Sequence, residues 1–546
     1  MSLPQSDADA RFERAVDRWF RDRLRLDPSL ATFVGIHEHD GLLPDASRGA
    51  IDQRVAFWRA TLREMETFDP VDLAPSHALD RDLLIHEARL ELHELTERRT
   101  WAARSNAAEE IGDALFPLFT RDFAPFAERV ERIVERLEQA PALLEQAAAR
   151  ISDAVPLWIE VDIESGEALP RFLDTIRSAA HAERSSDAVL ARLDETIRRT
   201  EAALAEHNQW LRADVLLAAN ASWQTGRDQF EEIVGLRELM ANGDEILAVG
   251  EQILADETSA RDAVCAEIDP TLAPEEVADV VKNNYPSTFG DALDAYRSTM
   301  DRARRFVVEH DLATMPADDN LVVIETPTYL RHLMPFAAYY QPPRFDPRPV
   351  GTYMVTPPSE PQMMREHNYA SISNTSVHEA YPGHHLQLTA ALANPSLVRL
   401  LCYSAAEFDE GWAFYCERTM KELGFDATPE HRYVQHTDAI WRATRIVLDI
   451  KLHRGQVGFD EAVDFLVART GFERPAALAE VKRYTSTPTY QLSYLFGRHL
   501  IDRLKADVQR AQGAGFSLKS FHDTLLYGGT MPVSYARRLF DGLASS

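Results

Sequence analysis

The sequence is dominated by apolar side chains that recur every three or four residues, from residue 8 to about residue 310. This spacing predicts helix after helix, because it gathers the apolar residues on one face of each helix. Each such face must be buried against a neighbour. One such stripe lies in segment 126–151, where Pro141 is expected to end or kink the helix. The clearest stripe, in segment 187–211, consists of Leu190, Leu193, Ile197, Leu204 and Leu211.

Strand-like runs are rare in this chain. The clearest are Leu321–Ile324 and Gly351–Thr356, each bounded by proline or acidic turn residues. Two proline-containing passages, 311–328 and 341–361, interrupt the helical pattern, because proline disfavours helix in the residue before it. We therefore expect a mainly α fold with one small β-sheet.

The same passages predict how the chain is divided. We place a boundary near residue 320, between a helical N-terminal part, 1–320, and a C-terminal part, 321–546, that carries the chemistry. The two parts are expected to pack as one body around a cleft, with the small sheet near it. Helical patterns return in the C-terminal part at 404–423, 433–453 and 459–468.

Charge and composition exclude several kinds of partner. Acidic side chains outnumber basic ones by 87 to 58, and the formal net charge of −29 disfavours binding to nucleic acid or anionic lipid. The start of the chain has no apolar core of a signal peptide, and no apolar run approaches the ~18 residues of a membrane span. Cys265, Cys402 and Cys416 lack the spacing of a disulfide framework or a thiolate zinc site. A cytoplasmic location without nucleic-acid or membrane partners is expected.

The sharpest local signal is the segment Val377–His385, which reads VHEAYPGHH. In the zincin motif H-E-x-x-H, two histidines four residues apart hold zinc, and the glutamate is the general base. Here position 382 is proline, and His384 and His385 lie six and seven residues beyond His378. On a straight helix they would be roughly 9 to 10.5 Å farther along the axis, whereas two nitrogen ligands of one zinc lie about 3.5 Å apart. A regular helix therefore cannot form the site.

A break at Pro382 and Gly383 could shorten this path. Proline clashes with the carbonyl four residues back, and glycine adopts backbone angles that other residues avoid. A turn there would bring a second histidine beside His378, although the spacing does not choose between the two later histidines. The alternative is structural, because Ser376 and Glu379 also have the spacing of a helix capping box.

A third ligand is expected from the helix predicted at 404–423. Its residues Glu407, Glu410 and Glu417 share one face. Much of the remaining surface of this helix is apolar, so a carboxylate on it would be partly buried and would need a partner. A metal ion would satisfy that need, and a solvated stripe of charge is the alternative.

Five segments resemble the bacterial DUF885 family, and the resemblance runs from about residue 15 to 540. Its most specific pattern is HExxPGH followed by EGW. That family is grouped with gluzincin-type metallopeptidases, whose distant relatives include the mostly helical M3 and M32 peptidases. The segments are HEHDGLLPD (37–45), HEAYPGHHLQ (378–387), DEGWAFYCER (409–418), YTSTPTYQLSYLFGR (484–498) and FHDTLLYGG (521–529).

The resemblance implies a large, helical, metallopeptidase-like fold with a zinc site. In the family motif the histidine directly after Pro-Gly is the fixed one, so the implied Zn²⁺ ligands are His378, His384 and Glu410. Glu379 is then the general base that takes a proton from metal-activated water.

Further site residues are expected near the C-terminus. Tyr490, Tyr494 and Arg498 are spaced four apart and would line one helical face. We expect Tyr494, and next Tyr490, to donate to the developing oxyanion, with core packing as the alternative. Arg498 either binds a substrate carboxylate or pairs with an acidic residue of the chain. His385 is the other predicted substrate-binding residue, and strand 351–356 could pair with an extended peptide.

Together these residues predict a zinc-dependent hydrolase of peptide bonds, with short peptides as substrates. The alternatives are a metal-dependent amidase acting on small molecules and a non-catalytic helical binding protein with a degenerate site. A di-iron or di-manganese carboxylate protein is disfavoured, because its Glu-x-x-His pairs do not occur within residues 360–499. His86 and His93 lie in an amphipathic pattern and are expected to be structural or surface residues.

Overall fold

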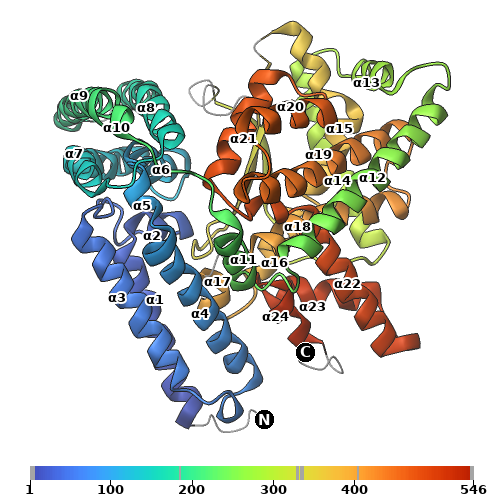
Figure 1. Cartoon of the computed structure of the whole chain (residues 1–546), viewed down its shortest axis with the longest axis horizontal. Coiled ribbons are helices and arrows are strands. Elements are labelled where there is room, and N and C mark those ends of the chain that lie inside the picture. Colours follow the sequence, from blue (N-terminus) through green and yellow to red (C-terminus); the bar gives the residue numbers. More distant parts are fainter. Residues whose placement is uncertain are drawn as a thin grey trace. The chain divides into compact units, whose positions relative to one another are not determined.

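The computed structural model of the chain is mainly helical with a small β-sheet, as the sequence predicts (Figure 1). The structure describes residues 7–183, 186–327, 331, 337–358, 360–401 and 405–540. Among these residues, none of the helices combines the length and apolarity that crossing a bilayer requires. Cys265 and Cys416 are buried free thiols, and Cys402 lies outside the described residues.

The chain forms two compact units, which are Met1–Trp223 with Pro343–Pro347, and Gln224–Pro342 with Arg348–Ser546. The division thus falls at residue 223, whereas the sequence placed it near residue 320. The reason is that helices between these positions bury their apolar faces against later elements. For example, the helix Gly243–Ile268 packs along the helix Pro429–His453.

The first unit is helical, and most of the apolar stripe predicted in segment 187–211 is buried in its core. Leu193, Ile197, Leu204 and Leu211 are buried, whereas Leu190 is partly exposed. Pro141 does not end α7, which continues from Phe126 to Arg150. Apolar residues on both sides of the proline are buried, and this burial stabilises the helix across it. Its helices are α1 (Asp7–Leu26), α2 (Pro28–Val34), α3 (Arg48–Glu66), α4 (Pro75–His93), α5 (Thr100–Ala103), α6 (Ala107–Thr120), α7 (Phe126–Arg150), α8 (Pro156–Ala182), α9 (Asp187–Trp210) and α10 (Leu216–Ala218).

The second unit contains all of the predicted site residues. The helices predicted at 404–423, 433–453 and 459–468 are confirmed as α18, α19 and α20, with Ser404 outside the described residues. Its helices are α11 (Gly226–Leu236), α12 (Gly243–Ile268), α13 (Pro274–Lys282), α14 (Phe289–Glu309), α15 (Tyr369–Glu379), α16 (His384–Ala391), α17 (Leu397–Leu401), α18 (Ala406–Glu422), α19 (Pro429–His453), α20 (Phe459–Thr470), α21 (Arg474–Ser486), α22 (Leu495–Gln512), α23 (Leu518–Gly528) and α24 (Val533–Ala536).

The sheet has three strands in the order β1-β3-β2. Strands β1 (Leu321–Glu325) and β3 (Gly351–Val355) confirm the two predicted strands, and they pair in parallel. The sequence missed β2 (Ala337–Tyr340), which pairs antiparallel with β3. Since β3 is the central strand, the prediction that its edge receives a peptide is wrong.

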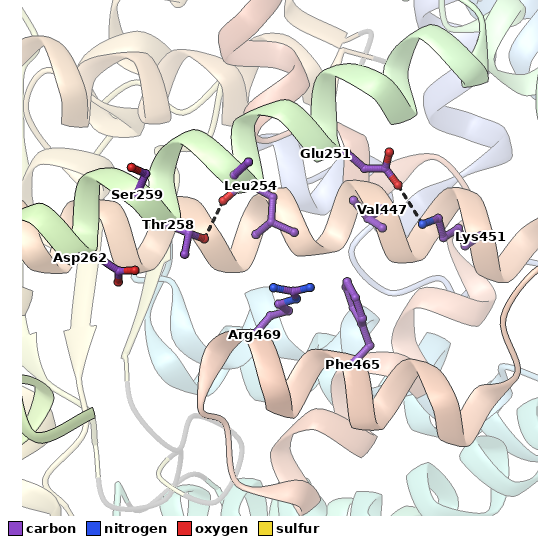
Figure 2. Close-up of a pocket in the computed structure, with 10 residues that line it drawn as sticks. Glu251, Leu254, Thr258, Ser259, Asp262, Val447, Lys451, Phe465 and Arg469 are labelled. Atoms are coloured by element: carbon purple, nitrogen blue, oxygen red, sulfur yellow. Dashed lines mark hydrogen bonds and ion pairs between the residues drawn. The ribbon is translucent and has the colours of Figure 1, made fainter. Parts of the chain in front are cut away.

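A cavity of about 550 Å³ lies between α12, α19 and α20 (Figure 2). Its walls include the apolar residues Leu254, Val447 and Phe465, and an ion pair between Glu251 and Lys451 joins α12 to α19 across 2.9 Å. None of the residues that line this cavity is a predicted site residue.

Helices α18 and α22 approach each other through a pair of glycines. A Cβ atom on Gly497 would lie 2.1 Å from the backbone oxygen of Glu407, and one on Gly411 would lie 2.4 Å from the carbonyl carbon of Gly497. Both distances are far below van der Waals contact. The two helices can therefore be this close only because both positions lack a side chain.

Replacing Gly497 by alanine should separate α18 from α22 and lower the free energy of unfolding by about 2 kcal/mol. The reason is the clash of the added methyl group with the backbone of α18. Urea denaturation followed by circular dichroism measures the change. The matched control is Gly235→Ala in α11, where no atom lies within 4 Å of the new Cβ. Equal stability of both variants would contradict the close contact.

Candidate metal centre

Helix α15 carries His378 and Glu379 in its last turn. The helix begins after Asn368, whose side chain accepts a hydrogen bond from the backbone nitrogen of Ser371 at 2.9 Å. Ser376 lies inside the helix and is not an N-cap, so the capping-box interpretation of Ser376 and Glu379 is wrong.

The chain turns back on itself directly after α15. The backbone nitrogen of Gly383 donates to the carbonyl of Val377 at 3.0 Å, which folds this segment over the last turn of α15. A Cβ atom on Gly383 would lie 1.8 Å from the carbonyl oxygen of His378, so only glycine permits the approach. Helix α16 begins at the next residue, His384, and the ring centroids of His378 and His384 are 4.8 Å apart. The predicted break at Pro382 and Gly383 is confirmed.

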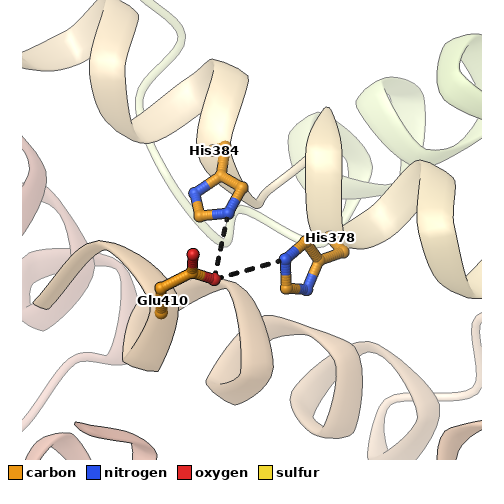
Figure 3. Close-up of side chains that lie close together, drawn as sticks. All are labelled: His378, His384 and Glu410. Carbon is orange, nitrogen blue, oxygen red and sulfur yellow. Dashed lines mark ion pairs between the residues drawn. The ribbon is translucent and has the colours of Figure 1, made fainter. Parts of the chain in front are cut away.

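His378, His384 and Glu410 each contribute one possible ligand atom to a single cluster (Figure 3). Nε2 of His378 lies 3.7 Å, and Nε2 of His384 lies 3.6 Å, from Oε2 of Glu410. Neighbouring ligands of a tetrahedral zinc ion are expected to be about 3.5 Å apart. Two imidazoles and one carboxylate in this arrangement therefore fit a zinc ion with one coordination position left open.

The EGW sequence has a distinct role for each of its residues. Glu410 faces the two histidines, and Gly411 permits the close contact with α22. The indole nitrogen of Trp412 donates to the backbone oxygen of Pro382 at 2.8 Å. This hydrogen bond ties α18 to the break between α15 and α16, and so holds Glu410 near both imidazoles.

The charges in this cluster favour a cation. Burial by itself lowers the pKa of His378, but its contacts with Glu410 and Glu417 outweigh burial and raise this pKa to about 10. Burial likewise raises the pKa of Glu410, but His378 and His384 outweigh it, and the net result is a pKa far below the ordinary glutamate value. The carboxylate thus stays ionised, and a divalent cation could supply the positive charge that His378 supplies here.

Glu417 orients His378 from the side away from Glu410. Its Oε1 lies 2.7 Å from Nδ1 of His378, and its Oε2 accepts from the side-chain nitrogen of Asn374 at 2.9 Å. With Nδ1 donating to this carboxylate, Nε2 is the nitrogen that can exchange its proton for a metal ion. The sequence placed Glu417 on the face of Glu410 but did not assign this role, for which the only signal is its position seven residues after Glu410.

The third glutamate on that face, Glu407, has a different partner. Its Oε2 pairs with Nη2 of Arg237 at 2.7 Å, and both side chains are buried. Of these three glutamates of α18, Glu410 is a candidate ligand, Glu417 orients His378, and Glu407 forms a buried ion pair.

Glu379 lies close to the same site. It is the last residue of α15 and is partly buried. Burial raises the pKa values of Tyr339 and Tyr353, and the negative charge of Glu379 raises them further. Burial lowers the pKa of His378, whereas the charge of Glu379 is one of the causes that raise it. The carboxylate is therefore near both the first histidine and the sheet.

Tyr490 and Tyr494 do not share a helical face with Arg498, so that part of the prediction is wrong. Tyr490 begins a 3₁₀ turn, Tyr490–Leu492, and Tyr494 precedes α22. Burial and the charge of Glu410 raise the pKa of Tyr494, and burial, Tyr494 and Glu410 raise that of Tyr490. The ring of Tyr494 packs against Phe414, four residues after Glu410 on α18, with centroids 6.0 Å apart, and the ring of Tyr490 packs against Tyr494 at 6.1 Å. Both phenols therefore lie near this part of α18.

The two predicted substrate-binding residues are engaged within the protein. Nη2 of Arg498 pairs with Oε1 of Glu257 at 2.8 Å, which is the internal alternative that the sequence left open. His385 is fully buried, with Tyr339 at 3.0 Å from Nδ1 and Asp319 at 3.1 Å from Nε2. His385 therefore joins α16 to the sheet, and the structure separates its role from that of His384.

Comparisons with known proteins find one matching family and several similar solved structures. DUF885, described as "Bacterial protein of unknown function", matches residues 28–539. A "putative lipoprotein of unknown function" from Shewanella oneidensis has a TM-score of 0.81 and 22% identity, over 97% of this chain and 99% of that chain. A "putative lipoprotein" from Colwellia psychrerythraea has a TM-score of 0.82 and 16% identity, over 97% and 98%. These two structures share the fold, and no curated protein matches.

Substituting each of the adjacent histidines should separate a ligand from a structural residue. His384→Ala should abolish stoichiometric zinc binding, because it removes one of three ligand atoms. His385→Ala should retain zinc but lower stability by about 2 kcal/mol, because it leaves a cavity and removes the hydrogen bonds to Tyr339 and Asp319. Metal analysis and thermal unfolding of both variants provide the measurement. Loss of zinc from His385→Ala alone would reverse the assignment.

Glu417→Gln should weaken zinc binding by about 10- to 100-fold. The amide can no longer act as an ionised acceptor for Nδ1 of His378, so the imidazole loses its fixed orientation and part of its basicity. Competition with a zinc chelator gives the affinity. Glu422→Gln, at the exposed end of the same helix, is the matched control and should bind zinc as tightly as the original chain.

Proposed function

The chain belongs to the DUF885 family, whose description assigns no activity, and we propose from its site residues that it is a zinc-dependent hydrolase of peptide bonds in short peptides. One observation carries the proposal. The Nε2 atoms of His378 and His384 converge on the carboxylate of Glu410, and Glu379 follows His378 directly in the chain.

The donor set supports zinc as the metal, because zinc accepts imidazole and carboxylate ligands in four-coordinate sites. His378, His384 and Glu410 would hold the ion. When bound by three protein ligands, zinc offers an open coordination position, lowers the pKa of bound water to about 7 and polarises a carbonyl. The same set, with a glutamate from a separate helix as third ligand, supports a placement among gluzincin-type metallopeptidases.

The remaining roles fall to residues of the chain itself. Glu379 takes a proton from the attacking water and returns it to the leaving nitrogen, so that one carboxylate is base and then acid. Tyr494, with Tyr490 beside it, donates a hydrogen bond to the carbonyl oxygen as negative charge develops there. Two features support these roles, namely the position of Glu379 after His378 and the nearness of both phenols to Glu410.

The same residues could hydrolyse amides of small molecules. Measuring turnover on a peptide library and on an amide library distinguishes a peptidase from an amidase. The cytoplasmic location expected from the sequence stays a prediction, because the two similar structures are described as putative lipoproteins. A non-catalytic binding protein is the remaining alternative, and it predicts metal binding without turnover.

Glu379→Gln should retain zinc and lose about 10²- to 10⁴-fold in kcat on peptides. The carboxamide keeps the shape of the side chain but cannot accept the proton. Mass spectrometry of library products gives the rate and the bonds cleaved.

A chelator should abolish the activity of the unchanged protein, and added zinc should restore it. The matched control is again Glu422→Gln, which should keep full turnover. The proposal fails if Glu379→Gln is as active as the original chain, or if the chelated protein still cleaves peptides.

A further inference from the structure

A buried arginine links α18 to the turn that carries the two tyrosines. Arg237 follows α11 directly and is only 8% exposed. Its Nη2 pairs with Glu407 at 2.7 Å and donates to the hydroxyl of Ser493 at 3.0 Å. Its Nη1 donates to the backbone oxygen of Thr489 and to the hydroxyl of Thr489 at 3.3 Å. We call Arg237 with Glu407, Thr489 and Ser493 the Arg237 clamp.

The clamp holds the chain immediately beside each tyrosine. Thr489 precedes Tyr490, and Ser493 precedes Tyr494. Thr489 and Ser493 are 1% and 0% exposed, so their positions are fixed by the protein interior. Thr489 also has a φ of 68°, a conformation that a threonine adopts only when its surroundings compensate for the cost. The hydrogen bonds from Arg237 supply part of that compensation.

The other end of the clamp lies on the helix of the candidate metal centre. Glu407 is three residues before Glu410, which places it nearly one turn earlier on α18. The ring of Tyr494 packs against Phe414 with centroids 6.0 Å apart, and Phe414 packs against His378 at 5.1 Å. One guanidinium group therefore sets the position of both phenols relative to α18.

We propose that Arg237 is a positioning residue, which fixes Tyr490 and Tyr494 beside Glu410 for hydrogen bonding to the substrate carbonyl. The inference rests on the proposed hydrolase function and goes beyond it, because Arg237 bonds to Glu407, Thr489 and Ser493, none of which is a candidate metal ligand. The planar fork of arginine is required, since four acceptor atoms on three residues must be reached at once. The ammonium group of lysine keeps the charge beside Glu407 but cannot make the same set of bonds.

The test is a double-mutant cycle between Arg237→Lys and the pair Tyr490→Phe/Tyr494→Phe. Arg237→Lys alone should lower kcat by about 10- to 100-fold with little change in KM, because the phenols lose their alignment. In the Tyr490→Phe/Tyr494→Phe background it should lower kcat by less than about threefold further, since both changes remove the same interaction. Equal losses in both backgrounds would overturn the positioning role.

The matched control is Arg454→Lys. Arg454 is another arginine with a buried side chain, 1% exposed, and it pairs with Glu231 and, at 2.6 Å, with Asp244. The Arg454→Lys variant should be less stable but keep its kcat. This control distinguishes the positioning of the tyrosines from a general loss of stability. If Arg237→Lys does not fold, Ser493→Ala removes a single hydrogen bond of the clamp and should lower kcat in the same direction by a smaller factor.

A readout independent of turnover distinguishes failure of this inference from failure of the proposed function. Tetranitromethane nitrates accessible tyrosines, and peptide mapping reports each position separately. Tyr490 and Tyr494 should react several-fold faster in Arg237→Lys than in the original chain or in Arg454→Lys. If the original chain is inactive but shows this nitration pattern, the proposed hydrolase function is wrong and the positioning by Arg237 stands. If nitration is unchanged in Arg237→Lys, the positioning role is wrong.

Discussion

The candidate site depends on one backbone contact, between Gly383 and the last turn of α15. The absence of a side chain at Gly383 lets its amide reach the carbonyl of Val377. As a result, the path from His378 to His384 is short enough for both imidazoles to face one carboxylate. A continuous helix through these residues would keep the two rings about two turns apart.

The contacts of α18 convert this local turn into a site with defined orientation. Trp412 bonds to the turn, Glu410 faces the histidines, and Glu417 fixes the ring of His378. The glycine contact with α22 brings a second helix against the same segment. Because each of these interactions uses a different residue of one helix, the position of α18 controls the ligands and their supporting hydrogen bonds together.

Much of the fold follows from local patterns. The apolar stripes predict helices because burial of one helical face is a property of a short segment, and strands β1 and β3 were likewise visible. The failures are cases in which tertiary packing outweighs a local rule. Pro141 does not end α7, although an end there was one of the two outcomes expected for it, and the even spacing of Tyr490 and Tyr494 does not produce one helix. The missed strand β2 is stabilised by pairing with β3 and not by a pattern of its own.

The sequence by itself determined the mainly helical class, the break at Pro382 and Gly383, and the set of residues from which a metal centre could be built. Spacing alone left His384 and His385 equivalent, and it left two possible partners for Arg498. The tertiary structure distinguishes the two histidines, since His384 lies beside Glu410 and His385 contacts Asp319. It also shows the partner of Arg498, which is Glu257. It further reveals Arg237 and the contact of Glu417 with His378. Periodicity and spacing describe neighbours along the chain, whereas these contacts join residues far apart in sequence and exist only once the helices are packed.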